Sequence, residues 1–306
     1  MTLVLLNPQS RGGRTAKCLP EIENWLHQHA PDCTLAAPLN LQKSLGLLRA
    51  QARGSRVVAV GGDGTINRWL PAILARELTL GVVPMGSGND SARALGLHGL
   101  SWQTTLQHAL QAPAQAVDVG HVSWTDLQGV RHDLPFLSSL TVGFDSAVAL
   151  RALRGPRWLQ GLPRYLWATL QELVQLQHWH LSVQVDGTPL TEGPALFLSS
   201  LNTPTYGSGL PAVPQAQMND GQLDLLLAGP FSAAGASLML PRLMTGKHLG
   251  HPLVRTQPYR EMHISCPQGV PVAADGEYLG VAASLDVRCA PAELQIVAGV
   301  PPSTAP

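Results

Sequence analysis

The feature that most constrains the fold is the stretch from Val57 to Asn67, a short β-branched run that ends in glycines and continues into a helical pattern. A buried parallel strand, a turn that needs glycine and an immediate helix start together direct backbone N–H groups toward a ligand. Asp63 lies inside this turn, and a carboxylate beside phosphates requires a divalent cation or a transferring proton to compensate it. The stretch therefore predicts Mg-nucleotide chemistry. The alternative is that Gly61 to Gly64 form an ordinary turn.

Two further predicted strands also end in small polar loops. Residues 2–6 lead into Asn7 to Gly13, and residues 80–83 lead into Pro84 to Asp90. Apolar residues at helical spacing follow the first loop, and a short helix follows the second. Because ligands bind outside the carboxyl ends of strands in an open parallel sheet, we expect the three loops to converge on one crevice. Residues 1–120 are thus predicted to form an α/β nucleotide-binding domain.

The second half of the chain has a different sequence pattern. Short strand-like segments separated by Gly, Pro, Asp and Asn extend over residues 121–290, with predicted helices at about 160–177 and 231–245. The strand-like segment at 293–297 allows the C-terminal segment, residues 291–306, to return to the first domain. The sequence therefore predicts a two-domain α+β protein, in which an α/β domain is followed by a mainly β domain.

Composition narrows the classes of partner and compartment. Twenty basic and twenty acidic side chains cancel, so no global charge favours nucleic acid, and we expect no nucleic-acid partner. The four cysteines are scattered, which argues against a zinc site and favours reduced thiols. His248 and His251 lack a third ligand and are expected to be surface or turn residues.

With no basic segment before the first apolar run, and with the longest uncharged run broken by glycine and proline, we expect a cytoplasmic protein with at most peripheral membrane contact.

Two acidic clusters stand out in the β-rich half. They are Asn219 to Asp224, and Asp275-Gly276-Glu277. Each combines carboxylates with a glycine that permits a tight turn. Such a segment suits a surface loop, and it also suits delivery of a carboxylate to a cleft.

Taken in order, the motifs resemble the diacylglycerol kinase catalytic fold of bacterial lipid kinases, which is related to sphingosine and ceramide kinases. The resemblance runs almost from end to end of the chain. The matching segments are Asn7-Pro8 with Gly12-Gly13, Gly61 to Thr65, Pro84 to Asp90, Val142 to Asp145, Tyr206 to Gly209, Asp220 to Asp224 and Asp275 to Glu277.

This resemblance implies a Rossmann-like first domain that binds ATP, similar to that of phosphofructokinases and NAD kinases, and a β-sandwich-like second domain that carries a lipid pocket. It implies an ATP- and Mg²⁺-dependent lipid kinase of phospholipid biosynthesis, with diacylglycerol as the default substrate at the membrane surface. The residues that would bind nucleotide are Asn7, Ser10, Gly12, Gly13, Gly61, Gly62, Asp63, Gly64, Thr65, Asn67, Ser87 and Asn89.

The same resemblance implies roles for the acidic clusters. Asp63 and Asp220 would hold Mg²⁺, with oxygens of Gln217 and Gln222 nearby. Glu277 is the favoured base for the attacking hydroxyl, while Asp275 would order the loop or the metal waters, although the sequence does not separate these two carboxylates.

Some features depart from the family pattern or leave alternatives open. Ser87 replaces a threonine, Asn219 replaces an aspartate, and no threonine matches the one expected near Leu35 to Pro38. The segment from Gly155 to Trp167 joins aromatic rings with arginines, which suits a membrane interface or a helix packed on the β domain. The competing functions are an NAD kinase-like or phosphofructokinase-like kinase and a non-catalytic lipid-binding regulator. Homodimer formation stays open.

Overall fold

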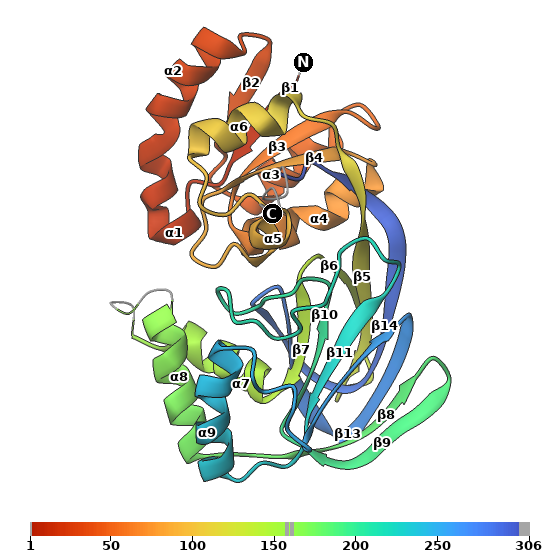
Figure 1. Ribbon diagram of the computed structural model, residues 1–306. Helices are drawn as coiled ribbons and strands as arrows, with labels where there is room; N and C mark the ends of the chain where they lie inside the picture. The colour runs from red at the N-terminus through yellow and green to blue at the C-terminus, as the bar shows by residue number, and fades with distance from the viewer. Residues whose placement is uncertain (1, 157–158, 160–161, 300–306) are drawn as a thin grey trace, which may run out of the picture. The chain divides into compact units, whose positions relative to one another are not determined.

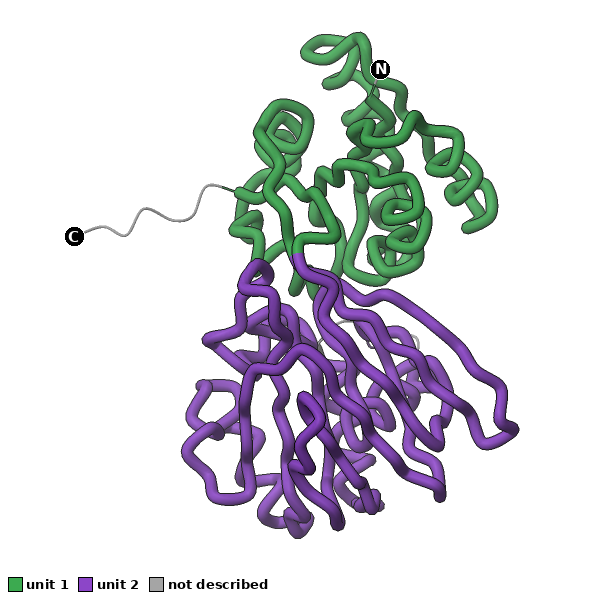
Figure 2. The backbone as a smooth tube through the Cα atoms, turned by 90° about the vertical axis from the view of Figure 1, so that its right-hand side faces the viewer, with its two compact units in different colours: residues 1–117, 292–306 green, residues 118–291 purple. Residues whose placement is uncertain are grey.

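The computed structural model describes residues 2–156, 159 and 162–299, and it divides the chain into two compact units. Unit 1 is Met1–Val117 with Ala292–Pro306, and unit 2 is Asp118–Pro291 (Figure 2). The elements of unit 1 are β1 (Thr2–Leu6), α1 (Ser10–Gly13), the 3₁₀ turn η1 (Arg14–Cys18), α2 (Leu19–His29), β2 (Cys33–Ala36), α3 (Leu41–Arg49), β3 (Arg56–Gly61), α4 (Asp63–Ala75), β4 (Thr79–Pro84), α5 (Asp90–Ala94) and α6 (Trp102–Gln111).

Unit 1 is built on a parallel sheet with the strand order β2, β1, β3, β4 (Figure 1). Val4 and Val58 face α2 and α6, whose Ile22 and Leu106 complete one core. Helices α3 and α4 pack on each other. They lie on the face of the sheet opposite to α2 and α6, because crossovers between parallel strands are right-handed. The chain therefore leaves the adjacent strands β1 and β3 toward opposite faces. Such a switch point opens a crevice at the carboxyl ends of the two strands.

Unit 2 is mainly antiparallel. β5 (Gln115–Asp126) enters it and β14 (Glu277–Ile296) leaves it. Its other elements are β6 (Arg131–Phe136), β7 (Ser139–Gly143), α7 (Phe144–Arg154), α8 (Leu162–Val174), β8 (Trp179–Val185), β9 (Thr188–Ala195), β10 (Phe197–Leu201), β11 (Leu223–Ala228), α9 (Ala233–Met244), β12 (Val254–Tyr259) and β13 (Glu261–Ala274).

The strands of unit 2 alternate between two environments. Leu140, Leu198 and Leu225 point into a core shared by the β-strands, because side chains on neighbouring strand positions face opposite sides of a sheet. On the other side, Phe197 of β10 and Ala228 of β11 pack with apolar residues of α7, α8 and α9, among them Phe144, and with Phe231 of the loop before α9. The helices thus cover one face of the strands that carry the acidic motifs.

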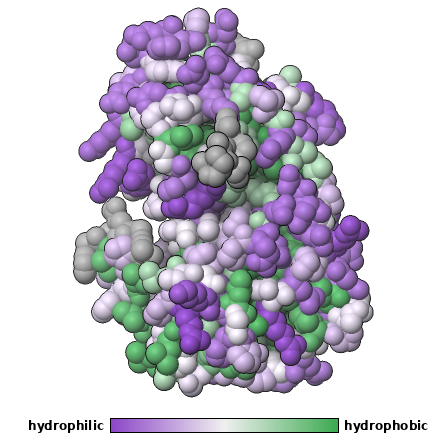
Figure 3. Space-filling view, viewed as in Figure 1, coloured by the Kyte–Doolittle hydropathy of each residue, from purple (hydrophilic) through white to green (hydrophobic). Residues whose placement is uncertain are grey.

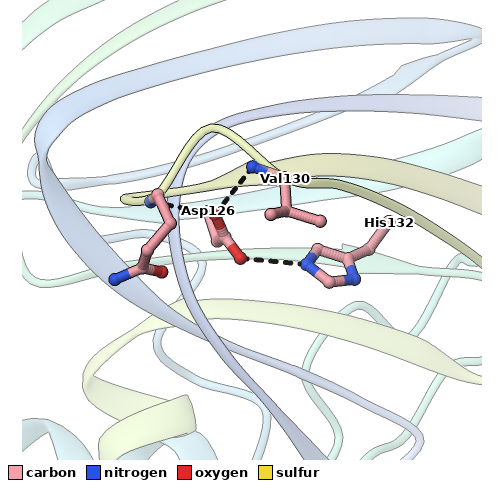
Figure 4. A network of polar contacts seen from close by, with 4 residues as sticks. Asp126, Val130 and His132 are labelled. Carbon is pink, nitrogen blue, oxygen red and sulfur yellow. Dashed lines mark hydrogen bonds and ion pairs between the residues drawn. The ribbon is translucent and has the colours of Figure 1, made fainter.

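The hairpin between β5 and β6 is closed by Asp126 (Figure 4). Its Oδ1 accepts hydrogen bonds from the backbone N–H groups of Gln128 and Val130, both at 2.9 Å, and its Oδ2 lies 3.1 Å from His132 Nε2. The hydrogen bond from His132 is the main reason that the pKa of Asp126 lies below its usual range. These contacts fix the register of β6, which leads the chain toward the segment from Leu137 to Ser139.

The predicted α+β organisation is confirmed: an α/β unit is combined with a β-rich unit, and α8 and α9 form where helices were expected. Of the arginine and aromatic segment, Arg157, Trp158, Gln160 and Gly161 lie outside the described residues. Within the residues that the structure describes, no helix is long and apolar enough to cross a membrane.

Candidate active site

In unit 1, the loops after β1 and β3 are joined by side-chain hydrogen bonds. Asn7 Nδ2 donates to Thr65 Oγ1 at 2.8 Å, and Ser10 Oγ lies 3.1 Å from the same Thr65 oxygen. Gly12 and Gly13 have positive φ angles of 66° and 88°, so the first loop adopts a left-handed backbone conformation that favours glycine. Asn67 is buried in α4. The structure therefore brings the first two predicted nucleotide loops together.

The second and third loops touch through glycine backbone. A Cβ on Gly62 would lie 2.6 Å from Gly86 Cα, so a side chain at Gly62 would force the loops apart. Asn89 closes the third loop: its Oδ1 accepts from Gly86 N at 2.8 Å and its Nδ2 donates to Gly86 O at 3.0 Å. Ser87 is exposed on this loop. All three loops thus gather at one edge of the unit 1 sheet.

Asp63 has a defined structural task in this assembly. Its Oδ2 accepts from Asp90 N at 3.0 Å, and its Oδ1 accepts from Ser91 N at 3.1 Å. The carboxylate therefore holds the first turn of α5, where backbone N–H groups have no partner within the helix.

A polar pocket of about 240 Å³ lies beside these loops in unit 1. Its lining is Asn7, Gln9, Pro38, Leu39, Asn40, Leu41, Ser44, Thr65, Arg68 and Trp69. Gln9 Nε2 donates to Leu39 O at 3.1 Å, which ties the loop after β1 to the loop after β2. Arg68 places a positively charged side chain in this pocket, and the sequence reasoning did not identify it. Its position one helical turn after Thr65 could have indicated that the two side chains lie on the same face of α4. The pocket offers donors and one positive charge to an anionic ligand.

In unit 2, Asp275 is buried and organises the backbone around it. Its Oδ1 accepts from Ser138 N at 2.8 Å and Ser139 N at 2.9 Å, and its Oδ2 accepts from Leu137 N at 3.0 Å. Asp275 N in turn donates to Ser139 O at 2.8 Å. Asp275 therefore fixes the turn from which Glu277, at the start of β14, projects.

The acidic cluster from Asn219 to Asp224 is ordered by one of its own carboxylates, Asp220, and by Asp118 from β5. The buried Asp118 accepts from Gly221 N at 2.7 Å through Oδ2, and Asp220 accepts from Gln222 N at 3.0 Å through Oδ1. Burial, followed by the charge of Asp220, raises the pKa of the neighbouring Asp224 to about 6. Sequence reasoning gave Asp118 no role, because its partner lies about a hundred residues away.

The carboxylate of Asp220 offers oxygen ligands of the kind that Mg²⁺ prefers, and a cation beside it would relieve the repulsion between Asp220 and Asp224. Within the described part of the chain, no three His, Cys, Asp or Glu side chains form a group that could hold a metal ion. An ion at this place would therefore need backbone, water or phosphate oxygens, as Mg²⁺ sites commonly do.

Two apolar cavities of about 140 and 60 Å³ lie under the helices of unit 2, and they share the lining residues Phe144, Asp145, Leu240 and Leu243. The larger one is also lined by Gly276, which belongs to the Asp275-Gly276-Glu277 turn. Its remaining walls combine apolar and aromatic side chains of the helices and of neighbouring loops and strands with three hydroxyl residues, Ser139, Thr141 and Thr169. Unit 2 thus places an apolar cavity directly beside the predicted catalytic carboxylates.

Asp145 is the one carboxyl group among the described residues of these walls. It lies in the first turn of α7, where Tyr206 donates to its Oδ2 at 2.8 Å and Ser199 donates at 3.4 Å. Burial raises the pKa of Asp145 to about 6, against the two hydrogen bonds, which lower it. The segments of Asp145 and Tyr206 match family motifs, but nothing local in the sequence shows that the two side chains meet.

The fold and these residues define a class of phosphotransferase in which a glycine-loop α/β unit is combined with a β-rich unit bearing carboxylates. Residues 1–122 match the model of the diacylglycerol kinase catalytic domain, and residues 138–298 match that of the YegS C-terminal NAD kinase beta sandwich-like domain. The chain belongs to the diacylglycerol kinase family of lipid kinases.

Curated relatives support this assignment. A "Diacylglycerol kinase" of Mycobacterium tuberculosis is 31% identical over 252 residues, covering 82% of this chain and 79% of the relative. A "Probable lipid kinase YegS-like" of Pseudomonas putida is 32% identical, covering 79% of this chain and 76% of the relative.

Solved structures show the same fold. A diacylglycerol kinase from Bacillus anthracis has a TM-score of 0.67 at 16% identity, covering 99% of this chain and 98% of the other. An NAD kinase from Archaeoglobus fulgidus in complex with ATP has a TM-score of 0.56 at 13% identity, and the match covers 97% of this chain and 93% of the other. At these identities the similarity concerns the fold alone, which lipid and dinucleotide kinases share.

Proposed function

We propose that the protein transfers the γ-phosphoryl group of Mg-ATP to the hydroxyl of a diacylglycerol-like lipid. The observation that carries this proposal is the apolar cavity of unit 2, whose lining includes Gly276 of the Asp275-Gly276-Glu277 turn. An apolar cavity suits acyl chains and offers few partners to a dinucleotide. The names of the relatives, diacylglycerol kinase and lipid kinase, point to the same substrate class.

The nucleotide would be bound by the three loops of unit 1. Their glycine backbone lets phosphates approach the N–H groups at the start of α4, and Asn7, Ser10 and Thr65 add side-chain donors. Arg68 in the adjoining pocket adds a positive charge. Asp63 keeps α5 and the third loop in place.

The acceptor hydroxyl would be activated in unit 2. Glu277 is our candidate for the base, because the three bonds to Asp275 assign that neighbour to holding the turn. A carboxylate is a weak base for an alcohol, so it accepts the proton late, when the oxygen is already bonding to phosphorus. Mg²⁺ near Asp220, with Gln217 and Gln222, would neutralise phosphate charge when bound.

Such an enzyme must meet its substrate at a bilayer, and we infer peripheral membrane contact from the cytoplasmic side. The exposed apolar residues of α8 and α9, among them Leu166, Leu170, Val174 and Leu238, support this inference. Figure 3 shows hydrophobic residues gathered over these helices.

The deciding experiment measures transfer of labelled γ-phosphate from Mg-ATP into a total lipid extract, and identifies the product by mass. We expect a labelled lipid whose formation is lost in Glu277→Gln. NAD is offered in a parallel reaction, because the NAD kinase fold is shared. Formation of NADP would support a dinucleotide kinase. ATP binding without any labelled product would support a lipid-binding regulator.

A further inference from the structure

Asp145 presents one unused carboxylate oxygen to the apolar cavities of unit 2. Tyr206 and Ser199 both donate to its Oδ2, at 2.8 and 3.4 Å. Among the residues that the structure describes, none donates a hydrogen bond to its Oδ1, and this atom is not sealed from solvent. Asp145 is partly exposed and lines both cavities. Its Oδ1 is therefore an open acceptor inside them.

A carboxylate oxygen without a donor is costly in apolar surroundings. A polar group that leaves water without forming a new hydrogen bond loses its hydration and gains nothing in exchange. Burial accordingly raises the pKa of Asp145 to about 6, and at neutral pH most of this carboxyl is still ionised. A ligand that donates a hydrogen bond to Oδ1 relieves the cost, whereas a ligand that brings an ester or ether oxygen to the same place increases it.

The strand register places this oxygen close to the turn that carries the candidate base. Ala274, the last residue before that turn, pairs with Leu140 of β7. Ser199, which donates to Asp145, pairs with the next residue of β7, Thr141. Successive residues of a strand are about 3.4 Å apart, and neighbouring hydroxyl groups of a glycerol are separated by a similar distance. A glycerol backbone with one hydroxyl at the turn can therefore bring the next hydroxyl to Asp145.

The volume of the cavities limits the number of chains. An apolar cavity of about 150 Å³ takes up benzene, a molecule of six carbons. At the same ratio, the cavities of about 140 and 60 Å³ hold roughly eight carbons together. This is room for part of one acyl chain, and it leaves no space for a second chain attached at the carbon that faces Asp145.

We propose that Asp145 selects a glycerolipid with a free hydroxyl beside the one that is phosphorylated, so that the preferred substrate is a monoacylglycerol-like lipid. This inference rests on the proposed function and narrows its substrate class. Oδ1 accepts the hydrogen bond of the second hydroxyl, and the single chain occupies the apolar cavity. A hydroxyl has one proton to donate, which matches the one open oxygen. Diacylglycerol has an ester at this place and presents only acceptor oxygens to the carboxylate.

The test compares two ether lipids that differ only in this donor, 1-O-octylglycerol and 1-O-octyl-2-O-methylglycerol. Their affinities for the purified protein are measured by calorimetry near neutral pH, without nucleotide. Hydrogen bonds to charged groups are the strong ones. We therefore expect the wild type to bind the lipid with the free 2-hydroxyl at least about tenfold more tightly than the methylated lipid.

Asp145→Asn should abolish this preference. Tyr206 still donates to the side-chain oxygen at the Oδ2 position, so the amide NH₂ group takes the place of Oδ1 and offers a donor where the lipid needs an acceptor. Asp286→Asn makes the same change at an exposed carboxylate of β14 outside both cavities. It is the matched control and should keep the wild-type preference.

The inference is wrong if the wild type binds the two ether lipids equally, if it binds neither, or if Asp145→Asn keeps the preference. Phosphorylation of both lipids by Mg-ATP is followed in parallel. Equal phosphorylation of the two lipids would refute the selection and leave the kinase reaction standing. A binding preference that depends on Asp145, without phosphorylation of either lipid, would support the selection and count against the proposed kinase reaction.

Discussion

Replacing Asp275 by asparagine should destabilise unit 2 strongly. The carboxylate accepts three backbone hydrogen bonds at 2.8–3.0 Å in a buried position. Asparagine keeps one acceptor oxygen, so at least one N–H loses its partner and faces an NH₂ donor. Hydrogen bonds to a charged group contribute about 1.5–3 kcal/mol each, and an unsatisfied buried donor costs about 1–3 kcal/mol. We expect the free energy of unfolding to fall by about 3 kcal/mol, measured by urea denaturation followed by circular dichroism.

Replacement of the neighbouring carboxylate, Glu277, should affect activity and not stability. Glu277→Gln should change the free energy of unfolding by less than about 0.5 kcal/mol and lower kcat by at least about a hundredfold, the usual contribution of a positioned base. The refuting result is an Asp275→Asn variant that unfolds like the wild type while turnover is lost. Asp275 would then belong to the chemistry, and the division between an ordering and a reacting carboxylate would be wrong.

Three further changes test other parts of the molecule. Gly62→Ala places a Cβ 2.6 Å from Gly86 Cα and should weaken ATP binding at least about tenfold by calorimetry, since overpacking costs about 1–3 kcal/mol; unchanged affinity would contradict the loop contact. Asp145→Asn removes a carboxyl whose pKa is raised to about 6. The native state gains stability from this raised pKa at low pH and loses it as pH rises through about 6. The variant should therefore be more stable than the wild type by up to about 3 kcal/mol near pH 7.5, and the difference should disappear near pH 4. A difference in stability that does not depend on pH would refute this prediction. Ala149→Trp fills the cavity lining and should lower lipid phosphorylation more than about tenfold while ATP affinity, measured in parallel, stays constant.

The α/β unit could be predicted from the sequence because its signals are local. Residues 57–60 are an uninterrupted buried run of β3, and Gly61 to Thr65 follow at once with the turn and the helix start. Each βα unit repeats this order, so strand, loop and helix are readable within about thirty residues. The position of the loops then follows from the general rule for parallel sheets.

The cavity of unit 2 could not be predicted in this way. Asp145 and Tyr206 are separated by 61 residues, and their hydrogen bond depends on the register that places β7 beside β10. His248 shows the same limit. Its spacing from His251 indicated a surface or turn residue. It does lie in a turn, but it is buried there, with Nε2 2.8 Å from Ala212 O, and burial lowers its pKa. The partner, 36 residues away, is invisible to a local pattern.

The motif carboxylates divide into two groups that the sequence cannot separate. Asp63, Asp118 and Asp275 each accept backbone N–H groups from a distant segment, and each thereby fixes a loop or helix start. Such a carboxylate is needed for the geometry of the site whether or not it touches substrate. Glu277 begins β14 one residue beyond the lining residue Gly276, and for this reason we propose it, and not Asp275, as the group that reacts. Losses of activity in the first group should therefore accompany losses of stability or order, and only a loss without them, as expected for Glu277, identifies a group that reacts.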